Sequence, residues 1–262
     1  GKRVAALVYM ANPDRAQVEA LAGFVGRGGN LLVFYSVPPE LAALMGMKSV
    51  GYQKGGTEGR WSMMRFIEPR PRGVPEAIRQ TSSNIFLVEP LPGRSQVLAW
   101  WHDRQGRRTG EAAWLASPAG YWMTHVLLAD GDSEAKGKLL LAFAGAHDPT
   151  IWGPAASAVL RKVRRVGGGI QAMSTAAGKL TDAGRRSSAL SAVQTLRRRD
   201  SECGAMLSAG KGIEAWEAAN ELRARMYEAY GLLQPSRKGE IRAVWDHSGM
   251  GLYPGEWPRT CR

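Results

Sequence analysis

Few side chains in this sequence could act as nucleophiles. Cys203 follows Glu202 in a segment of helical pattern, and a neighbouring carboxylate raises a thiol pKa and so suppresses the reactive thiolate. Cys261 lies in a Gly/Pro-rich loop. Ser36 follows an apolar run and is a conceivable nucleophile, but no G-x-S-x-G pattern surrounds it, so we expect a helix-capping or turn role. The two cysteines are far apart, so the sequence predicts no disulfide framework.

His125 is the histidine most suited to chemistry. It interrupts an apolar run, Tyr121 to Leu128, that we expect to be a strand. A buried polar group usually has a hydrogen-bond partner, so the favoured interpretation is a structural histidine bonded to Asp130 or Asp132. The alternative is that His125 contacts a ligand, in a remodelled site near the sheet edge or in a noncanonical catalytic centre.

The sequence predicts no metal site and no cofactor. His102-Asp103 and His147-Asp148 are adjacent pairs in turn-like segments, and neighbouring residues rarely converge on one ion. The glycine-rich segments 26–29 and 167–170 lack the strand-to-helix G-x-G-x-x-G context and the Walker lysine, so neither is expected to hold a phosphate.

A group of aromatic residues could form a platform on which a sugar stacks, since flat ring faces suit pyranose faces. It consists of Trp100, Trp101, Trp114, Tyr121 and Trp122. Alternation along the strand points only one of Trp100 and Trp101 inward, and large aromatics commonly fill the core. We expect packing for most of the group and name Trp100 and Trp101 as candidate ligand contacts.

The elements that must position these side chains begin with a βαβ pattern. Apolar runs at residues 3–9 and 31–35 predict buried strands, with parallel pairing expected for the first. Residues 14–27 and 38–45 have helical spacing and end at glycines. This alternation is typical of an open α/β sheet that is covered on both faces.

After residue 51 the pattern changes to shorter strand-like runs, which predict a mixed or antiparallel extension of the sheet. These runs are residues 61–67, 85–88, 96–101, 112–115 and 121–128. A helix is expected at 133–145. Residues 154–235 carry apolar positions three and four apart and predict two to four helices, with breaks near Gly167 to Gly169 and Gly210 to Gly212.

The chain is basic, with a formal net charge of +12 in 262 residues. Its densest basic groups lie in the helical segment, at residues 161–165, 185–186 and 197–199, where no aromatic residue stands between Trp152 and Trp216. Single-strand binders interleave rings with basic residues, so nucleic acid is not the expected partner. A solvated helix face is favoured over a site for an acidic protein or membrane surface. No apolar run reaches 18 residues, so no transmembrane segment is predicted.

Three stretches carry a family resemblance. They are residues 28–35 (GGNLLVFY) followed by 38–46 (PPELAALMG), residues 120–128 and residues 240–247. Together they resemble bacterial proteins of the glycosyl hydrolase-like 10 type. The resemblance implies a flavodoxin-like or amidotransferase-like domain, generally without activity, at residues 1–153. It also implies a helical connector at 154–239 and the first strand of a TIM barrel at 240–262. We expect the first βα unit and the rest of the barrel to be missing.

The resemblance also implies a setting and a function. Asp246 and His247 end the last predicted strand and would border the substrate cleft of the parent barrel. Carbohydrate would be bound through the missing barrel, in an extracytoplasmic or periplasmic location. A working class I amidotransferase needs a cysteine on a strained elbow, and neither cysteine fits. We therefore expect an accessory region that positions or oligomerises the hydrolase domain. The alternative is a basic interaction module that binds an anionic partner through its arginine-rich helices, which include Arg197 to Arg199.

Overall fold

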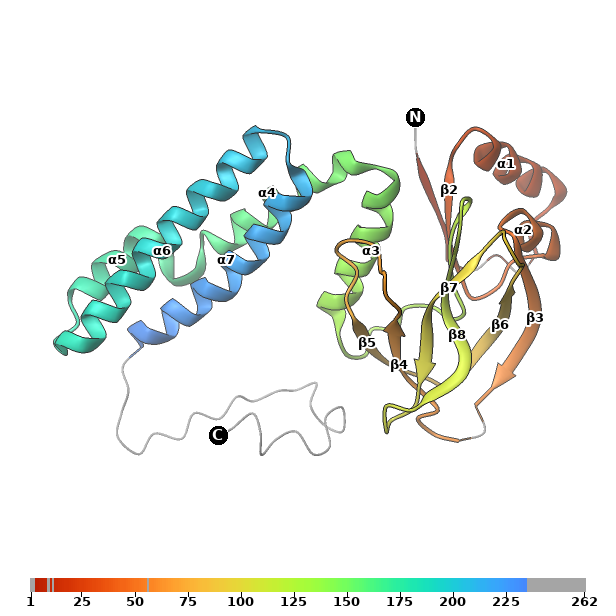
Figure 1. Ribbon diagram of the computed structural model, residues 1–262, viewed down its shortest axis with the longest axis horizontal. Helices are drawn as coiled ribbons and strands as arrows, with labels where there is room; N and C mark the ends of the chain where they lie inside the picture. Colours follow the sequence, from red (N-terminus) through yellow and green to blue (C-terminus); the bar gives the residue numbers. More distant parts are fainter. Residues whose placement is uncertain (1–2, 9, 11, 56, 235–262) are drawn as a thin grey trace. The chain divides into compact units, whose positions relative to one another are not determined.

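The computed structural model describes residues 3–8, 10, 12–55 and 57–234 (Figure 1). These residues form two compact units, one ending at Asp148 and the other starting at Pro149. The predicted barrel strand with Asp246 and His247, and also Cys261, lie outside the described residues. The assignment of 1–153, 154–239 and 240–262 to three domains stays a prediction.

The first unit is built on a seven-stranded sheet with strand order β1-β2-β9-β8-β7-β4-β5. Its strands are β1 (Val4–Leu7), β2 (Asn30–Phe34), β4 (Trp61–Phe66), β5 (Ala77–Ser82), β7 (Gln96–His102), β8 (Arg108–Ser117) and β9 (Gly120–Met123). Strands β1, β2 and β9 are parallel, and every further pairing in the sheet is antiparallel. This arrangement confirms the predicted α/β class with a mixed-strand extension.

A second, two-stranded sheet pairs β3 (Met47–Lys54) with β6 (Asn84–Pro90), antiparallel and with a register shift between Ser49 and Gly51. Strands β3 and β5 were not predicted from the sequence. β3 is mostly polar, the inward side of β5 carries the polar Gln80 and Ser82 beside Ile78, and both strands are stabilised by strands that lie far away in the sequence. Such strands have no continuous apolar run that would reveal them.

The seven-stranded sheet is covered on both faces, as predicted. Helices α1 (Arg15–Gly26) and α2 (Pro39–Leu44) lie on one side of the strands and α3 (Ser133–His147) on the other (Figure 1). Successive side chains of a strand point to opposite faces of the sheet. The side that faces α1 and α2 carries a core that includes Leu31, Val33, Leu115 and Trp122. On the other face the ring of Phe143 from α3 contacts three aromatic side chains. The distances between ring centroids are 3.9 Å to Tyr121, 4.9 Å to Trp114 and 6.3 Å to Phe66. Phe34 in turn packs edge-on against Trp114 at 5.8 Å.

Two strand predictions need correction. The first strand was expected to be buried, but it lies at the sheet edge, where Leu7 alone of its four residues is buried and the following Val8 is 65% exposed. The strand expected at residues 121–128 ends at Met123. The residues after it leave the sheet because side chains from β5 and α3 bind their backbone, as described below.

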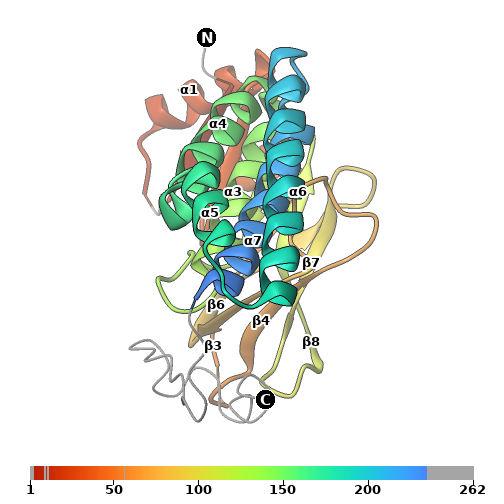
Figure 2. The same ribbon diagram turned by 90° about the vertical axis from the view of Figure 1, so that its left-hand side faces the viewer.

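The second unit is helical, as predicted. It contains two 3-10 turns, η1 (Pro149–Ile151) and η2 (Val166–Gly168), and four α-helices, α4 (Trp152–Val163), α5 (Ile170–Gly178), α6 (Ala183–Ser208) and α7 (Gly212–Leu233). Figure 2 shows α6 and α7 running alongside each other, with a core that includes Val193, Leu196, Leu222 and Met226. Gly167 to Gly169 all have positive φ and separate α4 from α5, and Gly210 separates α6 from α7. Within the described residues, no helix has the length and apolar character that a membrane crossing requires.

Candidate functional site

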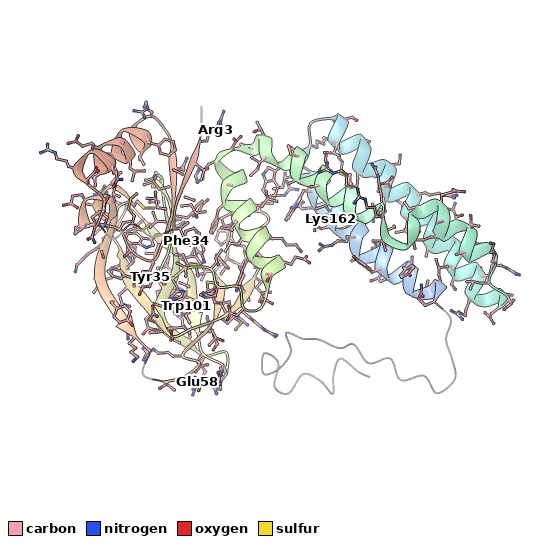
Figure 3. All side chains as sticks on the ribbon, turned by 180° about the vertical axis from the view of Figure 1, so that it is seen from behind. Arg3, Phe34, Tyr35, Glu58, Trp101 and Lys162 are labelled. Carbon is pink, nitrogen blue, oxygen red and sulfur yellow. The ribbon has the colours of Figure 1, made fainter. Side chains whose placement is uncertain are left out.

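The carboxyl ends of the parallel strands β2 and β9 are the natural place for a site in this fold. Open α/β sheets bind ligands in the crevice outside these ends. Tyr35 follows β2 and Thr124 follows β9, and the Tyr35 N–H donates to the Met123 carbonyl at 2.9 Å. The two chain segments therefore leave the sheet side by side, and Figure 3 shows Phe34 and Tyr35 in this part of the first unit.

Tyr35 occupies a strained backbone position. Its φ is 69°, and Asp132 is the one other non-glycine residue with positive φ in the described chain. A strained residue directly after a central strand is where α/β hydrolases present a nucleophile. Here the side chain is a phenol whose O–H donates to Asn84 Oδ1 at 2.9 Å, and the Tyr35 carbonyl accepts the Trp122 indole N–H at 3.1 Å. The position suited to a nucleophile is held by a side chain bonded to its surroundings.

Ser36 does not supply the missing nucleophile. It is buried, with 9% of its surface exposed, and within the described residues no hydrogen bond joins it to His125. It does not cap α2 either, since Pro38 is the N-cap residue and no side chain caps that helix. The capping role expected for Ser36 is therefore wrong.

His125 lies next to Tyr35, with ring centroids 5.7 Å apart in an edge-on arrangement. It is 6% exposed, and its Nδ1 lies 2.9 Å from the Val126 carbonyl oxygen, so the neutral ring carries its proton on Nδ1 and donates it there. Burial lowers the pKa of His125, an effect that the Val126 hydrogen bond and the Asp130 charge oppose. The result is an uncharged imidazole at neutral pH.

The predicted bonds from His125 to Asp130 or Asp132 are not formed. Instead, these carboxylates accept hydrogen bonds from the backbone of β5: Asp130 from the Thr81 N–H at 2.9 Å, and Asp132 from the Arg79 N–H at 2.6 Å. Both acids therefore satisfy donors at the outer edge of a strand. Within the described residues, no acid hydrogen-bonds to the His125 imidazole.

The path of residues 124–132 is set by two buried polar side chains. The Gln80 amide donates to the Val126 carbonyl at 2.8 Å and accepts from the Leu128 N–H at 2.9 Å. From α3, Lys136 Nζ donates to the Leu128 carbonyl at 2.8 Å, to the Asp130 carbonyl and to the Asp130 carboxylate at 3.3 Å. These bonds replace the pairing that a longer β9 would make, which is why the strand stops at Met123.

The tryptophans predicted as ligand contacts offer no bare ring face. Trp101 is fully buried, and its indole N–H donates to Thr124 Oγ1 at 2.9 Å (Figure 3). Trp100 packs against the core under α1 and α2, and the Arg108 guanidinium lies 3.5 Å from its ring centroid. The remaining members of the group, Trp114, Tyr121 and Trp122, are buried. Every member of the group is thus packed at least in part, and the ligand-contact role of Trp100 and Trp101 stays a prediction.

Metal and thiol chemistry find no support in the described part of the chain. There, no group of three or more His, Cys, Asp and Glu side chains could hold an ion. Cys203 is fully buried in the helical unit, and burial together with the charges of Asp200 and Glu202 raises its pKa. His102 Nδ1 contacts the Trp100 carbonyl at 3.2 Å, and burial lowers the pKa of His147.

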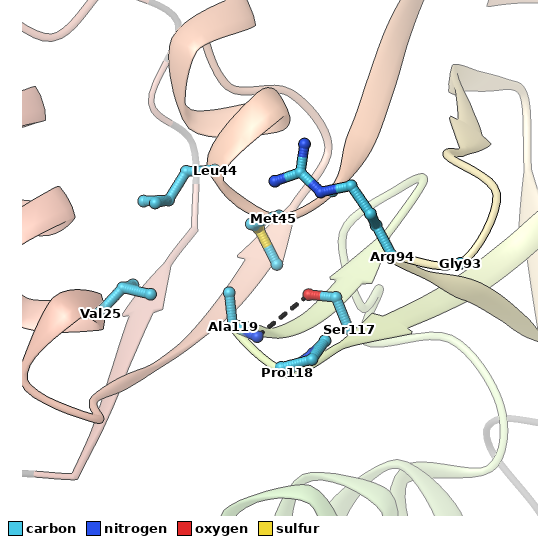
Figure 4. A pocket seen from close by; sticks show the side chains of 9 residues that line it. Val25, Leu44, Met45, Gly93, Arg94, Ser117, Pro118 and Ala119 are labelled. Carbon is cyan, nitrogen blue, oxygen red and sulfur yellow. Dashed lines mark hydrogen bonds between the residues drawn. The ribbon is translucent and has the colours of Figure 1, made fainter.

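A groove of about 400 Å³ lies at the opposite ends of β2 and β9 (Figure 4). Its floor is apolar and includes Val25, Leu44 and Ala119. Its polar groups are already bonded, because Arg94 donates to the Ala43 carbonyl at 3.0 Å and Ser117 Oγ accepts the Ala119 N–H at 3.2 Å. Three of its lining residues, Leu44, Met45 and Gly46, end one of the stretches that carry the family resemblance, but nothing in the sequence indicated a groove there.

Comparison with protein-family models gives no match, and neither does comparison with the curated proteins. Among solved structures, the chain is similar to a glutamine amidotransferase from Thermotoga maritima, with 11% sequence identity and a TM-score of 0.34. The similarity covers 57% of this chain and 65% of that one. A likeness this distant carries no inference about function.

Proposed function

We propose that this chain is a non-catalytic, amidotransferase-like accessory region that positions or oligomerises a glycoside-acting domain. The observation that supports the non-catalytic role most directly is the side chain at the strained end of β2. Tyr35 stands where a nucleophile would be presented, and its hydroxyl is bonded to Asn84.

The surroundings of Tyr35 support the same conclusion. Acyl transfer needs a chain of hydrogen bonds from nucleophile to base to orienting acid. His125 is a neutral base tied to the Val126 carbonyl, while Asp130 is engaged by the Thr81 N–H and by Lys136. The base therefore lacks both partners that a triad requires.

The carbohydrate setting rests on the resemblance of three sequence stretches to the glycosyl hydrolase-like 10 proteins. One of those stretches, residues 240–247 with Asp246 and His247, lies outside the described residues. Carbohydrate binding through a barrel, and an extracytoplasmic or periplasmic location, are part of this proposal and depend on that resemblance alone.

The arginine-rich helices have structural roles that weigh against the alternative of an anion-binding module. Arg198 and Arg199 both contact Glu202, at 2.9 and 3.5 Å, and Arg197 donates to Gln171 Oε1 at 3.0 Å. Arg185 donates to the Leu232 and Gln234 carbonyls at the end of α7. Arg197 and Arg185 thus join α6 to α5 and to the end of α7, whereas Arg198 and Arg199 pair with Glu202 within α6.

The test is turnover by the purified 262-residue chain, assayed for glutamine hydrolysis and for glycoside hydrolysis. We expect neither activity. A His125→Gln variant and a His102→Gln control separate true turnover from a contaminating enzyme. Activity that depends on His125 would be lost in the His125→Gln variant and kept in the His102→Gln control. Robust activity with that pattern overturns the proposal.

A further inference from the structure

The groove at the amino-terminal ends of β2 and β9 is built by four chain segments. The ends of α1 and α2 contribute Val25 and residues 44–46, the turn between β6 and β7 contributes residues 93–94, and the turn between β8 and β9 contributes residues 117–119 (Figure 4). A second hollow of about 530 Å³ shares residues 93, 94, 117 and 118 with this groove of about 400 Å³. Sites for small molecules have volumes of about 300 to 1,000 Å³. The two adjoining hollows are therefore large enough for a small ligand.

Arg94 is the single charged side chain among the described residues that line the two hollows. Within the described part of the chain it forms no ion pair, and its side chain makes one hydrogen bond, from a terminal guanidinium nitrogen to the Ala43 carbonyl at 3.0 Å. A guanidinium carries five N–H donors and keeps its positive charge in proteins. Further donors and a full positive charge are therefore available in the wall that the two hollows share.

The turn that carries Arg94 is fixed against the end of α2. The Leu91 N–H donates to the Gly46 carbonyl at 3.0 Å, and Ser95 Oγ donates to the same carbonyl at 2.6 Å. Gly46 has a φ of 67°, and an added Cβ there would lie 2.7 Å from the Arg94 Cβ. The two turns thus contact each other directly, and the groove exists before any ligand binds. A preformed site loses little conformational entropy on binding.

The rest of the lining combines a hydroxyl donor with apolar surface. Ser117 Oγ accepts the Ala119 N–H at 3.2 Å, and its own hydrogen has no acceptor within the described residues. Val25 and Leu44 supply apolar surface in the first hollow, and no described Asp or Glu lines either hollow. This lining suits a ligand that combines a negatively charged head with an apolar body.

We propose that the groove binds a small carboxylate with an apolar body, with the carboxylate on Arg94 and the body against Val25 and Leu44. The planar guanidinium matches the two oxygens of a carboxylate, and charge-assisted hydrogen bonds are about twice as strong as neutral ones. A carboxylic acid is ionised at neutral pH, so its charge complements the lining. This site stands apart from the accessory role, and either could fail without the other.

The test is a titration of the isotope-labelled 262-residue chain with octanoate, followed by amide chemical shifts. We expect saturable shifts at Gly46, Gly93 and Ala119, and none at Gly106, which lies in the turn at the other end of β7. Octanol has a similar body without the charge, whereas acetate and inorganic phosphate have the charge without the body. Each of these three probes should bind at least about tenfold more weakly than octanoate.

Two substitutions in the groove should each weaken octanoate binding at least about tenfold. Arg94→Gln removes the guanidinium. Ser117→Asp keeps Arg94 and can still accept the Ala119 N–H, but it adds a negative charge that repels the ligand. The second variant therefore tests the site even where the loss of the Ala43 bond unfolds the first. Arg104→Gln, which removes an exposed pair with Glu58 beyond the other end of β7, is the matched control and should leave binding unchanged.

Several results would overturn the proposal. Octanoate could fail to give saturable shifts, the shifts could map to another part of the chain, or a folded Ser117→Asp variant could bind octanoate as tightly as the unmodified chain. Equal binding of phosphate and octanoate would show a general anion site, and equal binding of octanol and octanoate would show a purely apolar one. Either outcome contradicts a site for carboxylates with an apolar body.

Discussion

The Tyr35 hydroxyl donates a hydrogen bond to Asn84 Oδ1 at 2.9 Å and so joins the strained end of β2 to the start of β6. Replacing Tyr35 with Phe keeps the ring against His125 and Phe86 and removes this bond. We expect the free energy of unfolding to fall by about 1 kcal/mol, measured by urea denaturation. Tyr52→Phe, at a side chain that is 59% exposed, is the control. Equal stability of the two variants would show that the bond is unimportant.

Lys136 should be the most sensitive polar residue of the first unit. Lys136→Met leaves the Leu128 and Asp130 carbonyls and the Asp130 carboxylate without their shared donor. We expect a loss of about 2 to 3 kcal/mol in unfolding free energy and faster amide exchange at Thr81. The matched control is Lys138→Met, which removes only the surface pair with Glu134 and should cost less than about 0.5 kcal/mol. Similar losses in both variants would contradict this role.

The stability of the first unit should fall as the pH drops below about 6.5. Burial holds the pKa of His125 and of His147 below the ordinary value of 6.5. Below pH 6.5 the unfolded chain binds protons that the folded chain does not. The histidines therefore contribute their whole stabilisation above pH 6.5, and the free energy of unfolding decreases as the pH falls from 6.5 toward the lowered pKa of the folded state. Urea unfolding between pH 7 and 5 measures the slope. The His125→Gln, His147→Gln double variant should flatten it, and an unchanged slope would assign the effect to other groups.

Gly120 is a position where no other residue should fit. Its φ is 132°, and an added Cβ would lie 1.9 Å from the Leu31 carbonyl oxygen. Gly120→Ala must therefore push β9 away from β2, and we expect a loss of more than about 3 kcal/mol, read as a lower urea midpoint. Gly137→Ala is the matched control in the exposed middle of α3, where a Cβ meets nothing within 4 Å. It should stabilise the protein by about 0.5 to 1 kcal/mol. A mild effect at Gly120 would contradict the close approach of the two strands.

Much of the fold was predictable from local signals. The apolar run of β2, the Pro-Pro-Glu start of α2 and the helical spacing of α6 and α7 each specify their element within a few residues of sequence. The α/β class and the helical segment follow from these elements. The strands β3 and β5 were not predictable in this way, because their stability comes from partners more than ten residues away.

The site was less predictable than the fold, for the same reason. His125 was found as a polar interruption, but its hydrogen-bond partner is the Val126 carbonyl rather than one of the acids nearby in sequence. The positive φ of Tyr35 leaves no signal in the residue type. The Arg108 guanidinium on Trp100 comes from a neighbouring strand, and no sequence spacing reveals such a contact.

The central claim is that the first unit presents no activated nucleophile. The most direct test is stoichiometric labelling of the native 262-residue chain with an electrophilic glutamine analogue, followed by peptide mapping. We expect no adduct within residues 3–148, and labelling of Cys203 only after denaturation. A one-to-one adduct on a residue of the first unit, lost in His125→Gln, would contradict it.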